Sequence, residues 1–193
     1  MGGRNGVERS KNSEEDASEK VSYPTPPFFL DLVREVMPVI ELDPASNPNS
    51  LVGAELTVFL PSWAEAIGLT DEEAEALGII VGDGLAIDWG GLHTFDNPPY
   101  GLAHNRKWAR KNADEAKKGS EIIALVPSAP GAKWFRPYRP KAYGGESDAC
   151  CLWEGRIKFH GAPHPADFEN AVIYFGPNPE KFRRVFGPKG WTT

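Results

Sequence analysis

The residues best suited to do chemistry form one short run, Asp96-Asn97-Pro98-Pro99-Tyr100-Gly101. Proline has a fixed φ and no N–H to donate, and Pro98 pushes Asn97 out of the helical region. The run therefore predicts a stiff, extended corner that presents an amide, a free carbonyl and a phenol ring together. An amino group on a flat ring could donate to the Asn97 oxygen and the Pro98 carbonyl while the ring stacks on Tyr100. A proline-rich turn that joins two elements is the alternative interpretation.

Two further acidic residues follow expected strands. Asp43 comes after the apolar run 39–42 and opens the loop Asp43-Pro44-Ala45-Ser46, and Asp83 comes after the run 79–81. A strand that ends in an acidic residue and then a loop is typical of the cofactor crevice of an α/β sheet. Glycine-rich phosphate loops are absent, which disfavours a dinucleotide or a nucleoside triphosphate. Taken alone, the Asp43 loop could also be an ordinary turn.

The elements that would hold these residues can be placed by periodicity and by terminal signals. Apolar residues at helical spacing predict a helix over 28–36. Thr25 would cap the start of this helix. Alternatively, the free N–H groups of the first helical turn would face an anionic ligand group. Residues 52–59 suit either a helix or a strand. Further helices are expected at 70–77 and 106–118, and strands at 39–42, 79–81, 121–127, 149–153, 155–159 and 171–176. This order predicts an α/β fold with a mostly parallel central sheet and an antiparallel edge.

Length and composition limit the possible classes of protein. The chain has 193 residues, enough for one domain, which we expect over 21–193 after a polar, disordered tail at 1–20. We find no apolar run long enough for a membrane span and no signal peptide, so we expect a cytoplasmic protein. Adjacent Cys150 and Cys151 indicate free thiols, and their spacing to His160 and His164 does not fit a zinc site, so no metal is expected.

Charge is distributed unevenly along the chain. The net charge is −6, yet residues 35–105 contain twelve acidic and no basic residues, whereas 106–193 contain sixteen basic and nine acidic ones. One half could hold a small cationic ligand while the other faces a polyanion. Within the second half, Lys133, Arg136, Arg139 and Lys141 alternate with aromatic rings, which suits phosphate contact with base stacking. An aromatic-anchored surface loop would have the same composition.

In sequence order these pieces resemble the amino-methyltransferases that use S-adenosylmethionine. They are similar in particular to the phage-type DNA adenine-N6 methyltransferases, which are small Dam-like enzymes. The resemblance runs from Tyr23 to Trp191, although residues 55–80 look longer than that family usually has and leave its ribose-binding acidic residue unassigned. The matching stretches are YPTPPFFLDLV, ELDPASNPNSLV, DGLAIDWGG, TFDNPPYG, ALVPSAPGAKWF, GRIKF and AVIYFGPNPEKFRRVFGPKGW.

The resemblance implies a Rossmann-like methyltransferase fold with helices on both faces of the sheet, and S-adenosylmethionine as the cofactor. Thr25, Pro26 and Pro27 would help hold its methionine end, Asp43 with Pro44, Ala45 and Ser46 would bind its amino group or nearby atoms, and Asp83 would accept from its adenine amine. The catalytic corner would be Asn97, Pro98, Pro99 and Tyr100. The four basic residues of 133–141 would contact DNA, and Phe159 could stack on the base, although a core phenylalanine is the simpler interpretation.

The implied reaction is methylation of a flipped-out adenine in double-stranded DNA, in the cytoplasm of a bacterial host if a phage or prophage encodes the chain. A protein glutamine or an RNA base are alternative acceptors, because the same corner suits any planar amine. A third alternative is a non-catalytic DNA-binding accessory protein that has kept the fold. Neither the DNA recognition sequence nor the oligomeric state follows from the sequence.

Overall fold

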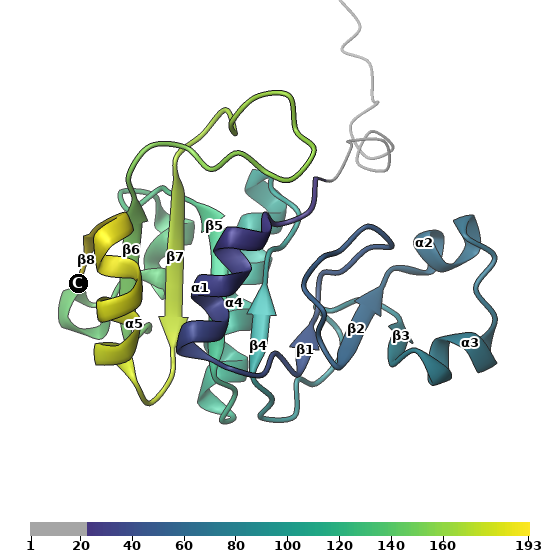
Figure 1. The fold of residues 1–193 in the computed structure, drawn as a ribbon. Helices are drawn as coiled ribbons and strands as arrows, with labels where there is room; N and C mark the ends of the chain where they lie inside the picture. Colours follow the sequence, from purple (N-terminus) through teal and green to yellow (C-terminus); the bar gives the residue numbers. More distant parts are fainter. Residues whose placement is uncertain (1–22) are drawn as a thin grey trace, which may run out of the picture.

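A computed structural model of the chain describes residues 23–193, and the expected tail at 1–20 lies outside that range. One eight-stranded sheet, in the order β3-β2-β1-β4-β5-β7-β6-β8, forms the middle layer (Figure 1). The five strands of the parallel half are β1 Leu42–Asp43, β2 Leu56–Phe59, β3 Ile79–Val81, β4 Thr94–Asp96 and β5 Ile122–Pro127. The antiparallel edge consists of β6 Ala149–Trp153, β7 Asn170–Phe175 and β8 Gly190–Thr192.

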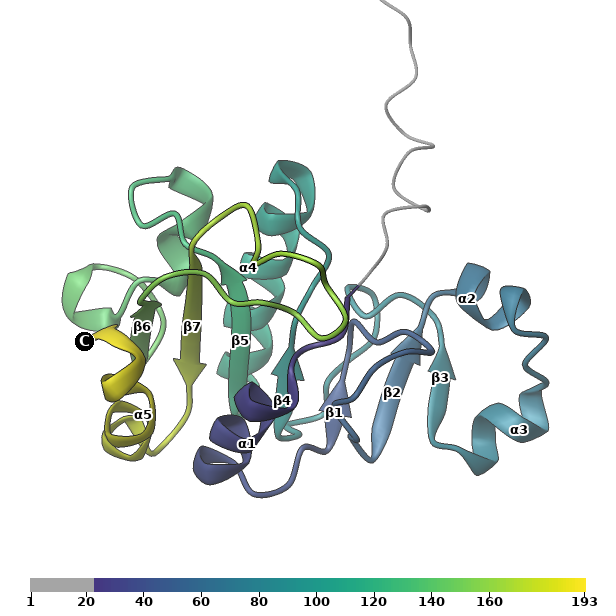
Figure 2. The same cartoon turned by 45° about the horizontal axis from the view of Figure 1, so that its top comes forward.

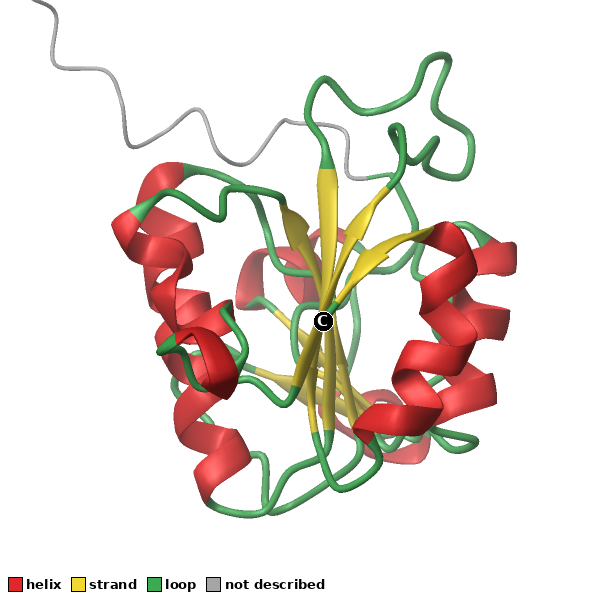
Figure 3. Cartoon of the chain, turned by 90° about the vertical axis from the view of Figure 1, so that its left-hand side faces the viewer, coloured by secondary structure: helices red, strands yellow, loops and turns green. Residues whose placement is uncertain are grey.

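Helices cover both faces of this sheet, as the end-on view in Figure 3 shows. On one face lie α1 Pro27–Val36 and α5 Pro179–Phe186, which share a core with side chains of β4, β5, β6 and β7. On the other lie α4 Leu102–Lys117 and the 3-10 helix η1 Lys133–Tyr138, which pack on the alternate residues of the same strands. Cys150 and Cys151 follow this alternation: both thiols are free and buried, one in each core. The expected α/β fold is therefore confirmed.

Residues 52–59, which the sequence left undecided between helix and strand, contain strand β2 and extend the sheet. Between β2 and β3 the chain forms two short helices, α2 Pro61–Ala66 and α3 Asp71–Ala76, which lie beyond the β3 edge in Figures 1 and 2. We call residues 60–78 the wing. A capping box closes the start of α3: the Thr70 hydroxyl accepts from the Glu73 N–H while the Glu73 carboxylate accepts from the Thr70 N–H.

Two expectations for local structure are wrong. Residues 155–159 form no strand, because Ile157 turns into the α1 core while its N–H is bound by the Asn170 side chain instead of a neighbouring strand. Thr25 does not cap α1, because Pro26 occupies the cap position and the Thr25 hydroxyl bonds elsewhere. The remaining short elements are η2 Lys141–Tyr143 and η3 Gly187–Lys189. No helix of residues 23–193 has the length and apolarity that crossing a membrane requires.

Candidate active site

The site lies where the strand order reverses. The chain runs outward from β1 to β3 and returns to β4 on the other side of β1, so β1 and β4 are parallel neighbours, with Leu42 paired to Thr94. In open α/β sheets ligands bind outside the carboxyl ends of the strands at such a reversal. Asp43 ends β1 and Asp96 ends β4, so the topology brings the Asp43 loop and the Asn97–Tyr100 corner to one crevice.

Asn97 is held from both sides. Its Nδ2 donates to Thr25 Oγ1 at 3.0 Å, and its Oδ1 accepts from the Tyr100 hydroxyl at 2.6 Å. Thr25 is buried immediately before α1, so the first helix and the corner after β4 meet at this amide. A carbonyl oxygen accepts two hydrogen bonds, and Tyr100 uses one of them. The Asn97 oxygen is therefore oriented and keeps one acceptor position.

Tyr100 is fixed by three contacts. Besides Asn97, its hydroxyl approaches the Leu125 carbonyl of β5 at 3.3 Å, and its ring meets Phe168 edge-to-face with centroids 5.1 Å apart. Burial, and then the negative charge of Asp96, raise the pKa of Tyr100 well above its usual value, so the phenol stays protonated and remains a donor. Pro98 is buried beside it and Pro99 is exposed.

Asp43 is a buried carboxyl at the carboxyl end of β1, only 3% exposed. Ser50 donates to its Oδ2 at 3.1 Å, and the Ala45 N–H approaches its Oδ1 at 3.4 Å. Burial raises the pKa of Asp43 to about 6, and the hydrogen bonds from Ser50 and Ala45 oppose that shift only in part. A cationic ligand group would stabilise the ionised form that burial disfavours.

Asp96 is fully buried on the opposite face of β4. Its Oδ2 accepts from Asn112 Nδ2 of α4 at 2.6 Å, whereas its Oδ1 has no hydrogen-bond partner among residues 23–193. Burial raises the pKa of Asp96 to about 8, and the nearby Asp43 adds to the shift. The Asp96 carboxyl is therefore mostly protonated near neutral pH, and a nearby cation would favour its ionised form.

Asp83 follows β3 in the loop that faces the Asp43 loop. Its Oδ1 accepts from the Leu85 N–H at 2.9 Å, and its side chain is exposed. The next residue, Gly84, touches the Asp43 loop so closely that a Cβ there would lie 1.9 Å from the Pro44 carbonyl oxygen. Direct backbone contact therefore joins the loops after β1 and β3. We call these two loops one wall of the candidate site, and the Asn97–Tyr100 corner the other wall.

The loop between β6 and β7, residues 154–169, passes over this end of the sheet (Figures 1 and 2). The His160 N–H donates to the Pro24 carbonyl at 2.9 Å, which ties the loop to the chain that enters α1. Phe159, our expected stacking residue, is partly buried against the α1 core, whereas Phe168 from the same loop contacts Tyr100. The sequence reasoning missed Phe168, although an aromatic ring in a long proline-rich loop was a usable signal.

The expected DNA-contacting residues do not form one group. Lys133 and Arg136 are exposed on η1, which follows the carboxyl end of β5, while Arg139 donates to the Pro130 carbonyl at 3.0 Å. Lys141 pairs with Asp148 at 2.5 Å and lines a hollow of about 490 Å³ together with Ser120 and Gly176. That hollow lies at the amino end of β5, whereas the Asn97–Tyr100 corner lies at the carboxyl ends of the parallel strands.

The comparisons with known proteins agree with this architecture. Neither the family models nor the curated proteins contain a match. A solved structure does match: a candidate RNA methyltransferase from Pyrococcus horikoshii, with a TM-score of 0.50 and 15% identity, covering 80% of this chain and 85% of that one. The two chains share a fold. At this identity the likeness extends to the methyltransferase-type arrangement of strands and helices, and to nothing finer.

The residues present suit S-adenosylmethionine, the cofactor expected from the sequence resemblance. S-adenosylmethionine has two cationic centres, an ammonium group and a sulfonium, and the neighbouring strands β1 and β4 end in two buried carboxyls, one with an oxygen that lacks a partner among the described residues. Strand β2 is followed by Leu60 and Pro61, so no acidic residue stands at its carboxyl end, and the ribose-binding acidic residue stays unassigned. Across residues 23–193 no group of three or more His, Cys, Asp or Glu is placed to hold a metal ion.

Proposed function

We propose that this chain is an S-adenosylmethionine-dependent methyltransferase that methylates the exocyclic amine of an adenine in DNA. The observation that carries the proposal is the amide of Asn97, held between Thr25 and Tyr100 after β4, the strand next to the one that ends in the buried Asp43. The amide is an oriented acceptor that does not ionise, and the carboxyl suits a cationic donor. Both lie at the crevice where α/β folds bind ligands.

The cofactor supplies an electrophilic methyl group on a sulfonium when it is bound. Asp43 would bind its ammonium group, with Pro44, Ala45 and Ser46 lining the same loop. Thr25, Pro26 and Pro27 would border its amino-acid end, since Thr25 contacts Asn97 directly. Asp83 has an exposed carboxylate that could accept from the adenine amine of the cofactor.

Asn97 would act on the target amine. An aromatic amine is a weak nucleophile because its lone pair is delocalised into the ring. The free acceptor position of Asn97 Oδ1 and the Pro98 carbonyl would draw its hydrogens out of the ring plane and stabilise the positive charge that grows on nitrogen. Tyr100 donates to Asn97 and so keeps the amide plane fixed, and much of the rate would come from this positioning.

The target base would reach this corner by flipping out of the helix, at a cost of about a few kcal/mol that stacking on Tyr100 partly offsets. Phe168, already edge-on to Tyr100, would form a second side of the base pocket. Lys133 and Arg136, exposed beyond the carboxyl end of β5, are the basic residues best placed for the phosphate backbone. Lys141 lies at the other end of the strands, beside Ser120, and its contact with DNA stays a prediction.

The test is methyl transfer by the purified protein to double-stranded DNA, single-stranded DNA, RNA and a glutamine-containing peptide, with the modified positions mapped. We expect N6-methyladenine in DNA, and about a hundredfold to thousandfold loss in Asn97→Ala, the range seen when one transition-state hydrogen bond is removed. Cofactor binding and the melting temperature should be retained in that variant.

Three outcomes would contradict the proposal or part of it. Equal activity of Asn97→Ala and the unaltered protein would reject the role of the amide. Methylation of RNA or of a protein glutamine in preference to DNA would keep the methyltransferase assignment and replace the substrate. Absence of S-adenosylmethionine binding by isothermal titration would favour a non-catalytic nucleic-acid-binding protein with the same fold.

A further inference from the structure

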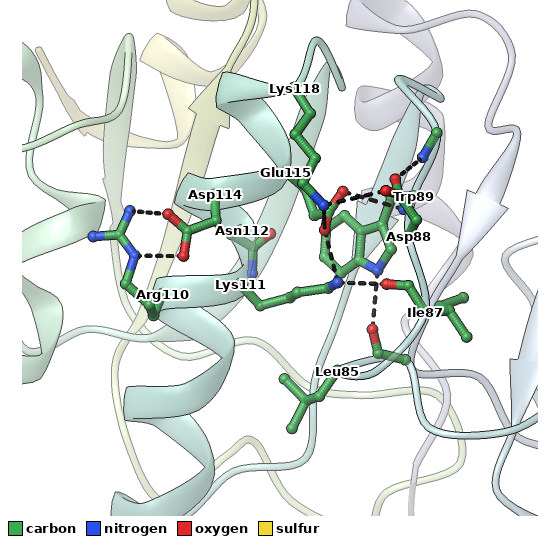
Figure 4. Close-up of polar contacts among 12 residues, drawn as sticks. Leu85, Ile87, Asp88, Trp89, Arg110, Lys111, Asn112, Asp114, Glu115 and Lys118 are labelled. Atoms are coloured by element: carbon green, nitrogen blue, oxygen red, sulfur yellow. Dashed lines mark hydrogen bonds and ion pairs between the residues drawn. The ribbon is translucent and has the colours of Figure 1, made fainter.

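Helix α4 carries a buried charged residue for which the proposed reaction has no direct use. Glu115 is 1% exposed, and its carboxylate accepts from the Trp89 N–H at 3.1 Å, Lys111 Nζ at 2.7 Å and Lys118 Nζ at 2.9 Å (Figure 4). Burial alone would raise the pKa of Glu115, but the hydrogen bonds from Lys111 and Lys118 lower it below its usual value. The carboxylate is therefore ionised and fully paired.

This cluster holds a loop that has no regular structure of its own. Lys111 also donates to the Ile87 carbonyl and lies 5.5 Å from the centroid of the Trp89 ring. Trp89 is fully buried, and its Nε1–H donates to the Gly84 carbonyl at 3.0 Å. Gly84 in turn touches Pro44. A continuous set of contacts thus runs from Glu115 through Trp89 to Gly84, the residue beside Asp83.

A second cluster on the same helix reaches the other wall of the crevice. Asn112 lies between Lys111 and Glu115 in sequence, is fully buried, and donates through Nδ2 to Asp96 Oδ2 at 2.6 Å. The same nitrogen approaches the Trp108 carbonyl at 2.9 Å and the Tyr138 hydroxyl at 3.1 Å. Asp96 is bonded directly to Asn97, so Asn112 anchors the backbone from which the catalytic corner departs.

We propose that α4 positions the two walls separately: Glu115 and Lys111 position the Asp83 loop that binds the cofactor, and Asn112 positions the corner that acts on the amine. These are positioning residues, because each acts through another residue and not on the ligand. The inference rests on the proposed methyl transfer. Since the two clusters hold different walls, loss of one should affect cofactor affinity, and loss of the other should affect turnover.

The experiment compares three variants of α4 by isothermal titration with S-adenosylhomocysteine and by steady-state methylation. Glu115→Gln keeps the shape and removes the charge; we expect the Kd to rise roughly tenfold or more, as a displaced binding loop should cause, with kcat within about twofold of the unaltered protein. Asn112→Leu should show the reverse, an unchanged Kd and a kcat lowered by roughly tenfold or more.

Arg110→Ala is the matched control. Arg110 lies on the same helix and pairs with Asp114 and Glu146, but on the exposed side, away from both clusters. We expect its Kd and kcat to match those of the unaltered protein. All melting temperatures are measured, because a purely structural role would lower stability without splitting Kd from kcat.

A second measurement keeps the inference testable if Glu115→Gln does not fold. In the unaltered protein, hydrogen exchange of the Leu85 and Trp89 amides should slow when S-adenosylhomocysteine binds. Trp89→Phe, which removes the donor to Gly84, should weaken binding and abolish that protection. Unchanged exchange together with unchanged binding in Trp89→Phe would overturn the inference. Failure of the unaltered protein to bind S-adenosylhomocysteine at all would instead overturn the proposed function.

Discussion

Side-chain burial differs strongly between two regions of the molecule. One is the side of the sheet that carries the Asn97–Tyr100 corner, and the other is the wing beyond β3. On the first side, α1 buries Phe29, Leu30 and Val33 almost completely, and α5 stacks Phe182 against both Tyr174 and Phe186. In the wing, α2 and α3 bury one alanine each. The wing also leaves several large apolar side chains exposed, namely Leu60, Ile67 and Leu77.

This difference shows where rigidity is needed. The corner depends on Thr25 before α1 and Leu125 on β5 keeping their places, and both belong to the densely packed half. The wing supplies no residue to that network. It carries five carboxylates and no basic residue, and its helices are defined by local signals such as the Thr70 cap. We therefore expect global stability to reside in the first half and local opening in the second.

One pair of substitutions tests that contrast directly. Leu30→Ala and Leu77→Ala remove the same atoms, but Leu30 is 1% exposed and Leu77 is 66% exposed. Leu30→Ala should lower the free energy of unfolding by about 2–5 kcal/mol, the range for leucine in a packed core. Leu77→Ala should change it by less than about 0.5 kcal/mol, as at other surface positions.

Urea unfolding followed by circular dichroism measures both values. Leu30→Ala should also reduce methylation, because it loosens the helix that places Thr25. Equal destabilisation by the two substitutions would show that the wing is part of the cooperative core, and the contrast would then be wrong.

The pH dependence of stability gives a second comparison of the two regions, because one carboxyl in each region contributes with the opposite sign. The folded pKa of Asp43 is raised to about 6, so the folded chain binds more protons than the unfolded chain above about pH 4. Its contribution to stability is fully present below about pH 4 and is lost as the pH rises through 6, by about 1.5 kcal/mol between pH 5 and 7.5. In the wing, hydrogen bonds from Thr70 lower the pKa of Glu73, so its contribution is lost as the pH falls.

Melting temperatures of Asp43→Asn and the unaltered protein across pH 5 to 7.5 check this sign. The variant should lose less stability with rising pH than the unaltered protein does. A cationic cofactor should reverse the trend for the unaltered protein, because it favours the ionised carboxylate, so stabilisation by S-adenosylmethionine should increase with pH. Parallel curves for the two proteins would contradict the raised pKa.

Whether an expected helix or strand is confirmed depends on how close in sequence the residues that cause it to form lie. The helix expected at 70–77 and the strands expected at 79–81, 121–127, 149–153 and 171–176 are confirmed, because capping residues and continuous apolar runs act within a few residues. The strand expected at 155–159 is absent, because Ile157 and Phe159 pack against the α1 core without joining the sheet. Strand β8 could not be foreseen, because three residues join the sheet only through long-range pairing with β6.

The site shows the same limit. Strand-end reasoning placed Asp43 and Asn97 after two strands, and those strands, β1 and β4, are parallel neighbours in the sheet. The roles of the two residues stay predictions. It did not find Glu115, because a charged residue on a strongly basic helix suggests a solvated face, and its burial depends on Trp89, distant in sequence. Asn112 was missed because its burial likewise depends on residues distant in sequence, Asp96 and Tyr138. Residues whose role is to hold other residues leave no local signal in the sequence.

The smallest effect, and the most local, should come from the cap of α3. Thr70→Ala removes the hydroxyl that accepts from Glu73 N–H and would cost about 1 kcal/mol of helix stability, whereas Thr70→Ser should keep the bond. Because the wing is only loosely tied to the packed half, we expect faster hydrogen exchange in residues 71–77 and little change at β4 or β5. Faster exchange at Phe95 and Ile123 as well would mean that the wing and the corner unfold as one unit.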